Sequence, residues 1–237
     1  MYKKIVNLTF LPVFEKKIVL MKALAVPLIC LVLTNILTTQ YPNNFPISIF
    51  AIIILLCINI TIAIVTHRVL LLGEQSVATW GEFAFGKREL SFFISTILIG
   101  LICIPILFLS FIPMLGIFIA VFLILIIFSR LSLVFPSIAI DEKLDLSQAW
   151  NFTKEYKLLT FFTIVIFPTI VSVVLGAVYS LVIGFLVGTV WSQLYVLYPV
   201  LDVFIAVFVV SALSATYRVI KEQHPEYFEK ETESQTK

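Results

Sequence analysis

Apolar blocks of about twenty residues constrain this chain more than any other feature. Residues 91–109 carry no charged side chain, and residues 111–129 carry none either. A helix of about 20 apolar residues spans the hydrocarbon core of a bilayer. Of the 237 residues, 61% are hydrophobic and 13% are charged, whereas a soluble domain has roughly 45–50% and about 25%. The chain is therefore predicted to be an integral membrane protein. Its net charge of +2 is too small to indicate a nucleic-acid partner.

The expected fold is all-α, with six transmembrane helices arranged as three hairpins. The spans are predicted at about 19–39, 47–66, 91–109 and 114–134, within 158–188, and at about 198–217. Pro113 separates the third span from the fourth, because proline cannot continue the helical hydrogen-bond ladder. Residues 1–220 form one membrane domain in this interpretation, and residues 221–237 form a charged cytoplasmic tail.

The distribution of basic residues predicts the orientation. All sixteen lysines and arginines fall in segments that six spans would place on the side of the N-terminus. The opposite loops, 38–46, 110–113 and 189–197, contain none. Cytoplasmic loops carry the excess of Lys and Arg, so both termini are predicted to be cytoplasmic. Residues 23–37 resemble the apolar part of a signal peptide, but no small-residue cleavage site follows them, so we expect a retained span.

Two half-polar segments with a tryptophan precede the third and fifth spans. In the first, Val77, Trp80 and Ala84 would share one helical face. In the second, Leu146, Ala149 and Trp150 would do so, with Ser147 or Asp145 as the N-cap. Both are predicted to be interfacial amphipathic helices on the cytoplasmic side.

Arg130 interrupts the apolar run of the fourth span. Placed about 22 Å along a helix from Leu115, it would lie inside the cytoplasmic boundary of a core about 30 Å thick. One interpretation is a topology anchor whose long side chain reaches the headgroups. The other is a ligand-binding residue for an anionic headgroup or substrate, since a guanidinium donates two parallel hydrogen bonds to phosphate. Pro136 would then end or kink the helix, and residues 137–140 would run along the membrane surface.

Three further side chains are candidates for ligand binding. Asp202 lies within the sixth span, either as an outer-interface residue after Pro199 or as a proton or cation site. His67 and Arg68 end the second span; His67 either sits at the interface or titrates near neutral pH.

A stripe of small residues marks the fifth span. Ser172, Gly176, Ser180, Gly184 and Gly188 recur at every fourth position. Small residues let helix backbones approach closely in lipid, so this stripe is predicted to serve helix packing, within the chain or in a homodimer. Pro168 is expected to kink the same helix.

The chain carries no recognisable catalytic signature. It lacks HExxH, GxSxG, P-loop and GxGxxG patterns, and Cys30, Cys57 and Cys103 have neither metal-ligand nor redox spacing. No catalytic residue, metal site or cofactor is therefore predicted.

Residues 60–160 carry a family resemblance, which is most specific over residues 130–153. The run Arg130-Leu-Ser-Leu-Val-Phe-Pro136, followed by Asp141 and by Leu146-Ser147-x-Ala149-Trp150-x-x-Thr153, resembles a segment of bacterial six-span inner-membrane proteins. These include the YciC type and the membrane domain attached to some glycerophosphoryl diester phosphodiesterases. The resemblance implies a fold and a location in the bacterial inner membrane, but no reaction, because the phosphodiesterase catalytic domain has no counterpart here.

The sequence thus favours a non-catalytic multi-pass protein that organises or helps handle lipids or envelope proteins. Its expected partners are membrane lipids and either a second copy or another membrane protein. A small transporter for an anionic or lipid-like substrate, with a site near Arg130, is the first alternative. A lipid-modifying enzyme is the second.

Overall fold

The computed structural model describes residues 1–81, 86–142 and 144–224, and their secondary structure is helical throughout. The predicted tail, residues 221–237, lies mostly outside these ranges, as do Ala84 and Lys143. The elements are α1 (Tyr2–Glu15), α2 (Lys17–Ala23), α3 (Ala25–Gln40), α4 (Phe45–Leu72), η1 (Glu74–Ser76), α5 (Lys87–Leu107), η2 (Phe108–Phe111), α6 (Gly116–Leu131), α7 (Val134–Ala139), α8 (Leu146–Phe152), α9 (Lys157–Thr160), η3 (Phe161–Ile166), α10 (Phe167–Thr189), η4 (Ser192–Leu197) and α11 (Tyr198–Lys221).

Five of the helical segments are long and apolar enough to cross a membrane, and a sixth qualifies if α2 and α3 form one broken span. The axes of α2 and α3 differ by 53°. The bend follows from Pro27, which lacks the N–H that would otherwise donate to the carbonyl of Ala23. Gly81, with φ of +78°, packs against that carbonyl, and a Cβ at Gly81 would overlap it. The prediction of an all-α membrane protein is confirmed at this level.

α1 is a helix that precedes the first span. It packs along α11, where it buries Ile5 and Thr9. Ser211 donates its hydroxyl hydrogen to the carbonyl of Thr9 over 2.8 Å. The lysine-bearing N-terminal segment is therefore part of the folded protein.

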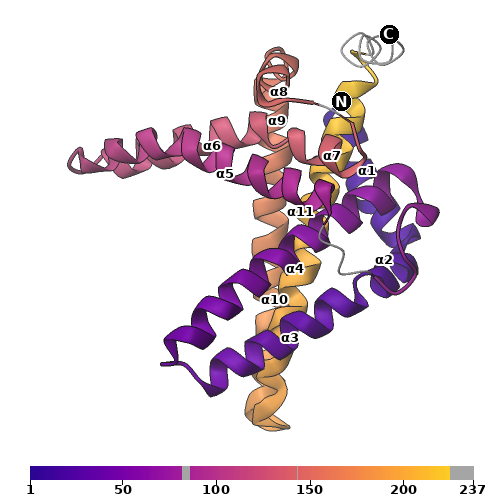
Figure 1. Cartoon of the computed structure of the whole chain (residues 1–237), viewed down its shortest axis with the longest axis vertical. Coiled ribbons are helices and arrows are strands. Elements are labelled where there is room, and N and C mark those ends of the chain that lie inside the picture. The colour runs from indigo at the N-terminus through magenta and orange to yellow at the C-terminus, as the bar shows by residue number, and fades with distance from the viewer. Residues whose placement is uncertain (82–85, 143, 225–237) are drawn as a thin grey trace.

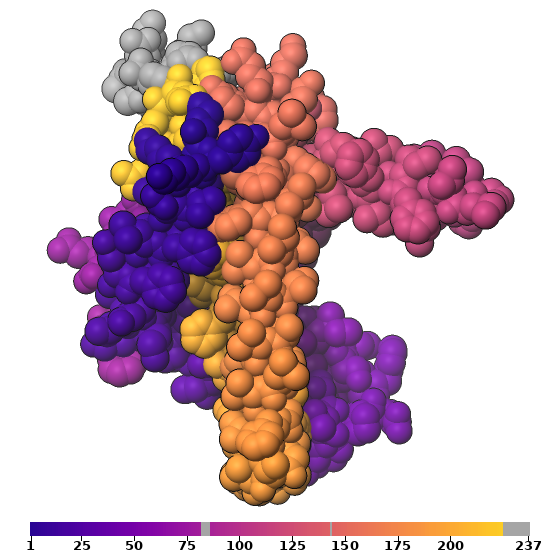
Figure 2. Space-filling model, turned by 180° about the vertical axis from the view of Figure 1, so that it is seen from behind, coloured from indigo at the N-terminus to yellow at the C-terminus, as the bar shows by residue number. Residues whose placement is uncertain are grey.

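Long helices that follow one another in the chain are in contact, α3 with α4, α5 with α6, and α10 with α11, and α11 also packs along α4; these successive helices are called pairs below. Figure 1 shows that the pairs diverge from a common base, with the α5–α6 pair pointing sideways from the α10–α11 pair. The tips of the pairs are the connections at 41–44, 108–115 and 190–197. Seen from behind, α10 forms an uncovered column and the α5–α6 pair protrudes from the base (Figure 2).

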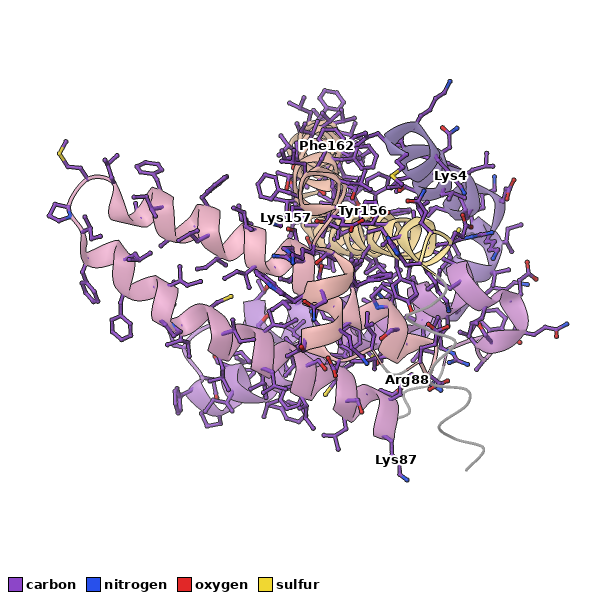
Figure 3. The ribbon with its side chains drawn as sticks, turned by 90° about the horizontal axis from the view of Figure 1, so that it is seen from above. Lys4, Lys87, Arg88, Tyr156, Lys157 and Phe162 are labelled. Atoms are coloured by element: carbon purple, nitrogen blue, oxygen red, sulfur yellow. The ribbon has the colours of Figure 1, made fainter. Side chains whose placement is uncertain are left out.

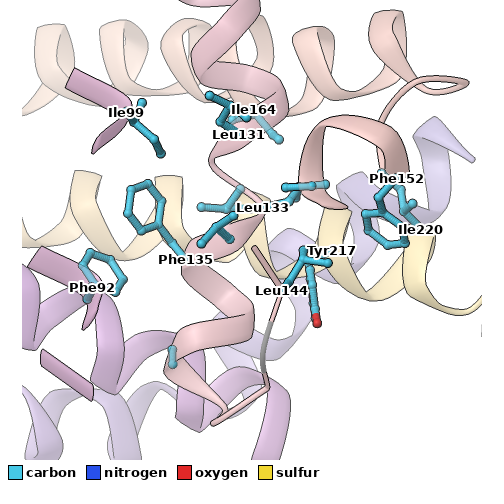
Figure 4. Close-up of a cluster of buried hydrophobic side chains, with 14 of the residues drawn as sticks. Phe92, Ile99, Leu131, Leu133, Phe135, Leu144, Phe152, Ile164, Tyr217 and Ile220 are labelled. Atoms are coloured by element: carbon cyan, nitrogen blue, oxygen red, sulfur yellow. The ribbon is translucent and has the colours of Figure 1, made fainter. Parts of the chain in front are cut away.

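A cluster of buried side chains, here named the basal core, joins the three pairs where they converge (Figure 4). It draws on α4, α5, α6, α7, α8, η3 and α11. Its members are Ile60, Ile64, Phe92, Ile99, Leu131, Leu133, Val134, Phe135, Ala139, Leu144, Ala149, Phe152, Ile164, Leu213, Tyr217 and Ile220. Most buried residues of the long helices lie near this end, so the base is where the chain packs against itself.

The segment after Arg130 differs from the prediction. Residues 134–139 form α7, which is buried in the basal core instead of running along the membrane surface. Pro136 is the third residue of α7, a first-turn position at which the missing N–H costs no helical hydrogen bond. The proline therefore fits a short helix that α4, α5 and α11 surround.

The two tryptophan segments also differ from each other. The second is the helix α8, capped as expected: the amide of Gln148 donates to the carboxylate of Asp145 over 2.6 Å. In the first, η1 is followed by turns through Trp80, so the predicted helix is absent over 77–81, and Ala84 lies outside the described residues.

Pro168 lies at the second position of α10, directly after the π-helical η3. At the position of the predicted kink, the helix changes from π-helical η3 to α-helical α10. π-helix occurs mostly as single turns inside α-helices, and such a turn is one of the identifiable causes of a helix kink.

Candidate functional site

Asp141 links two of the helix pairs through arginine. Its carboxylate accepts hydrogen bonds from Nε and Nη2 of Arg88, both at 2.8 Å, and from Nη1 of Arg68 at 2.9 Å. Arg68 lies near the end of α4, and Arg88 lies in the first turn of α5. The bidentate geometry to Arg88 is the stronger form of this pair. Lys87 and Arg88 lie at the base of α5, away from the tip of its pair (Figure 3).

Local geometry holds these three side chains in place. Arg68 also donates from Nη1 to the carbonyl of Ala139 at 3.0 Å and from Nε to that of Ser76 at 2.9 Å. Asp141 follows α7 with φ of +65°, the left-handed region that Asp tolerates better than most residues. The two arginines hold the pKa of the Asp141 carboxyl below its usual value, with the hydrogen bond from Arg88 the largest cause.

Glu142 links the same turn to the third helix pair. Its carboxylate accepts hydrogen bonds from the Tyr217 hydroxyl and the Lys221 ammonium, both on α11. Tyr217 is only 1% exposed, so its hydroxyl reaches the acid from within the basal core. Asp141 and Glu142 together therefore connect α4, α5 and α11 at the base.

A pocket of about 110 Å³ lies beside this cluster. Its polar wall contains Arg68, Arg88 and Glu89, and its apolar wall contains Ile64 and Val65. The remaining described lining residues are Thr61, Ser76, Val77, Ala78 and Gly81. Glu89 accepts the amide of Gly86 at 2.8 Å and so caps α5. The pocket lining thus includes two arginines and aliphatic side chains.

Arg130 is buried, with 4% of its surface exposed. Its guanidinium carbon lies 3.4 Å from the ring centroid of Trp150, a cation–π arrangement. It donates from Nη2 to the carbonyl of Trp150 and from Nε to the hydroxyl of Thr153 at 3.1 Å. Among the described residues it forms no ion pair with a carboxylate. Its observed contacts dock α8 onto the end of α6, and its predicted role in ligand binding stays a prediction.

Three arginines near the C-terminal ends of long helices, Arg68 on α4, Arg130 on α6 and Arg218 on α11, occupy different environments. Arg68 is part of the Asp141 cluster, Arg130 is stacked on a tryptophan, and Arg218 is exposed and pairs with Glu222 at 3.3 Å. Their similar positions at helix ends do not reveal this difference, because it depends on which segment each arginine contacts.

His67 lies between α4 and α11 and is 1% exposed. Its Nδ1 is 2.7 Å from the Ser214 hydroxyl, and within the described chain its Nε2 has no hydrogen-bond partner. The structure places it in the protein interior. Asp202 is exposed in the first turns of α11, shortly after Pro199, and forms no ion pair with any described residue.

The small-residue stripe on α10 makes little contact within the chain. A Cβ added at Gly176, Gly184 or Gly188 would meet no atom within 4 Å. Ser180, Gly184 and Gly188 are exposed, and Ser172 and Gly176 are partly buried. The stripe is therefore an open face of α10.

In the described part of the chain, no group of three or more His, Cys, Asp or Glu side chains has a metal-binding arrangement. Comparison with protein families, with curated proteins and with solved structures finds no match for this chain. The site that the structure brings together, Arg68, Arg88, Asp141 and Glu142, includes one residue predicted to bind a ligand, Arg68, and one named only within the family resemblance, Asp141. Asp141 and Glu142 could have been found as adjacent acids in a chain with only 14 acidic residues.

Proposed function

We propose that this protein is a non-catalytic multi-pass protein of the bacterial cytoplasmic membrane that organises or helps handle lipids. In this proposal the six spans form three hairpins with both termini in the cytoplasm. The basal core and its Asp141–Glu142 cluster then lie at the cytoplasmic side of the bilayer.

The observation that carries the proposal is the exposed apolar surface of the diverging helix pairs. Leu101, Phe118 and Val178, one from each of α5, α6 and α10, are 53%, 71% and 58% exposed. Aliphatic and aromatic side chains in such numbers are unfavourable in water. Acyl chains would cover them, and because the pairs diverge, lipid would also lie between them (Figure 1).

The charge distribution supports the orientation. The cations at Arg68, Arg88 and Lys221 cluster at the base. The tips at 41–44, 108–115 and 190–197 contain no lysine or arginine. A base that faces the cytoplasm satisfies the positive-inside rule.

The experiment that tests this function uses the purified full-length protein in vesicles of phosphatidylethanolamine, phosphatidylglycerol and cardiolipin. We expect the lipid masses to stay unchanged over several hours and an entrapped anionic dye to be retained. New lipid species that require the protein would identify a lipid-modifying enzyme. Dye release that Arg130→Leu abolishes would identify a transporter, and either result would replace the proposal.

A further inference from the structure

We propose that the pocket between Arg68 and Arg88 binds the phosphodiester headgroup of an anionic phospholipid. This inference rests on the lipid-handling function proposed above and assigns it a site. The pocket lining combines guanidinium groups with aliphatic side chains, and exposed apolar residues neighbour the lining residues in the sequence.

The arginines retain donors for an anion. A guanidinium carries five N–H donors. Arg68 uses Nε and Nη1, and Arg88 uses Nε and Nη2. Within the described chain, Nη2 of Arg68 and Nη1 of Arg88 donate to no acceptor. Phosphate oxygens suit such donors because the planar guanidinium matches them in geometry as well as charge.

Asp141 and Glu89 offset the charges of the two arginines, so an anion would bind through the guanidinium hydrogen bonds and not through an excess of positive charge. Asp141 forms ion pairs with both arginines and so offsets one of their two positive charges. Glu89 is the acid among the described lining residues, and it is held at the first turn of α5 by the amide of Gly86. Its carboxylate opposes an anion in the pocket, and this gives the proposal a second, independent test.

The volume is large enough for a phosphate group, and the aliphatic lining favours a lipid over a soluble anion. A volume of about 110 Å³ holds several waters at roughly 10–15 Å³ each, and so also a phosphate group. Ile64 and Val65 form the aliphatic side of the pocket. Trp80 and Leu90, next to the lining residues Gly81 and Glu89, are 65% and 48% exposed. A tryptophan at such a position is typical of the headgroup level of a membrane, where a phosphodiester is attached to acyl chains.

The test measures lipid selectivity in the full-length protein. Purified protein in neutral detergent is exposed to an equimolar mixture of phosphatidylglycerol and phosphatidylcholine, and the retained lipid is quantified by native mass spectrometry. We expect wild type to retain phosphatidylglycerol selectively. Arg88→Gln should weaken retention by about tenfold or more, the factor for loss of one charge-assisted hydrogen bond. Glu89→Gln keeps an acceptor for the Gly86 amide but removes the opposing charge, so it should strengthen retention.

Arg218→Gln is the matched control, because Arg218 is an arginine near the base with a 56% exposed side chain, and it does not line this pocket. It should leave retention within about twofold of wild type. Equal retention by wild type, Arg88→Gln and Glu89→Gln would overturn the site while leaving lipid selectivity intact. No selectivity in wild type would overturn both the site and the lipid-handling function. A third outcome is a protein that retains no lipid but binds inorganic phosphate, with that binding lost in Arg88→Gln. This result would assign the pocket to a soluble anion and overturn the lipid assignment.

Discussion

The Asp141 cluster makes a quantitative prediction about how the helix pairs are held together. Asp141→Asn keeps the size of the side chain and tolerates the left-handed backbone, but it removes the charge that Arg68 and Arg88 share. The interactions affected are three hydrogen bonds of 2.8–2.9 Å, because the amide of asparagine has one acceptor oxygen in place of two and carries no charge. Because the Asp141 side chain is 56% exposed, solvent screening reduces their worth, and each exposed ion pair contributes roughly 0.2–1 kcal/mol. With two arginines and one bidentate contact, we expect a loss of about 1–2 kcal/mol.

The assay is thermal unfolding of the purified protein in detergent. A loss of this size corresponds to a fall of about 2–8 °C in the unfolding midpoint. The difference between wild type and Asp141→Asn should shrink at high salt, because these charges are partly exposed to solvent. Glu222→Gln is the control, since Glu222 pairs with Lys4 and Arg218, whose side chains are both 56% exposed. Equal midpoints for Asp141→Asn and wild type would refute the idea that this acid holds the pairs together.

The same variant predicts a pH dependence. The arginines lower the pKa of the Asp141 carboxyl in the folded protein. A depressed pKa contributes stability that is present above the unfolded value, about 3.9 for Asp, and is lost as pH falls through the folded value. The stability difference between wild type and Asp141→Asn should therefore be constant from pH 6 to 8 and should decrease below about pH 4. A difference that grows on acidification would contradict this assignment of charge.

Three further predictions concern packing, a buried polar contact and topology. Gly116→Ala should lower the unfolding midpoint, because its Cβ would overlap the carbonyl of Leu109 at a cost of roughly 1–3 kcal/mol. Gly184→Ala, whose Cβ would meet no atom within 4 Å, should leave the midpoint unchanged. Equal midpoints for the two variants in a thermal scan would show that Gly116 is not closely packed against Leu109. Ser214→Ala should destabilise the protein by about 1–3 kcal/mol, because it leaves Nδ1 of the buried imidazole on α4 without its hydroxyl partner; an unchanged midpoint would exclude that contact. In a variant without native cysteines, Asn43→Cys should react with a membrane-impermeant maleimide in intact cells and Glu155→Cys should not, and the reverse pattern would invert the topology.

The apolar helices could be predicted well from the sequence, because the hydrocarbon interior of the membrane permits few other backbone structures. Charge-free runs such as 91–109 are long enough for a membrane and have few other stable conformations. The break at Pro113 and the N-cap at Asp145 are local effects, and both predictions agree with the structure. The bend between α2 and α3 was not predicted, although Pro27 was a visible signal for it.

The site was harder to predict because it depends on contacts between segments far apart in the chain. Arg68 meets Asp141 across 73 positions, and Tyr217 meets Glu142 across 75. Nothing in the local pattern distinguishes Arg68 from Arg130 or Arg218. The burial of α7 has the same origin, since an apolar hexapeptide with a proline suits the membrane surface or a core equally well.

The most direct test of the account is native mass spectrometry of the wild-type protein released from bacterial membranes in a mild detergent, with subunit count and bound lipid masses read together. The account predicts a population that carries defined anionic phospholipid at a higher proportion than the membrane from which it was extracted. A protein that carries no lipid, or lipid in the same proportions as the bulk membrane, would contradict it. In that case protein partners, with the open stripe of α10 as the first surface to examine, would take the place of lipid in the explanation.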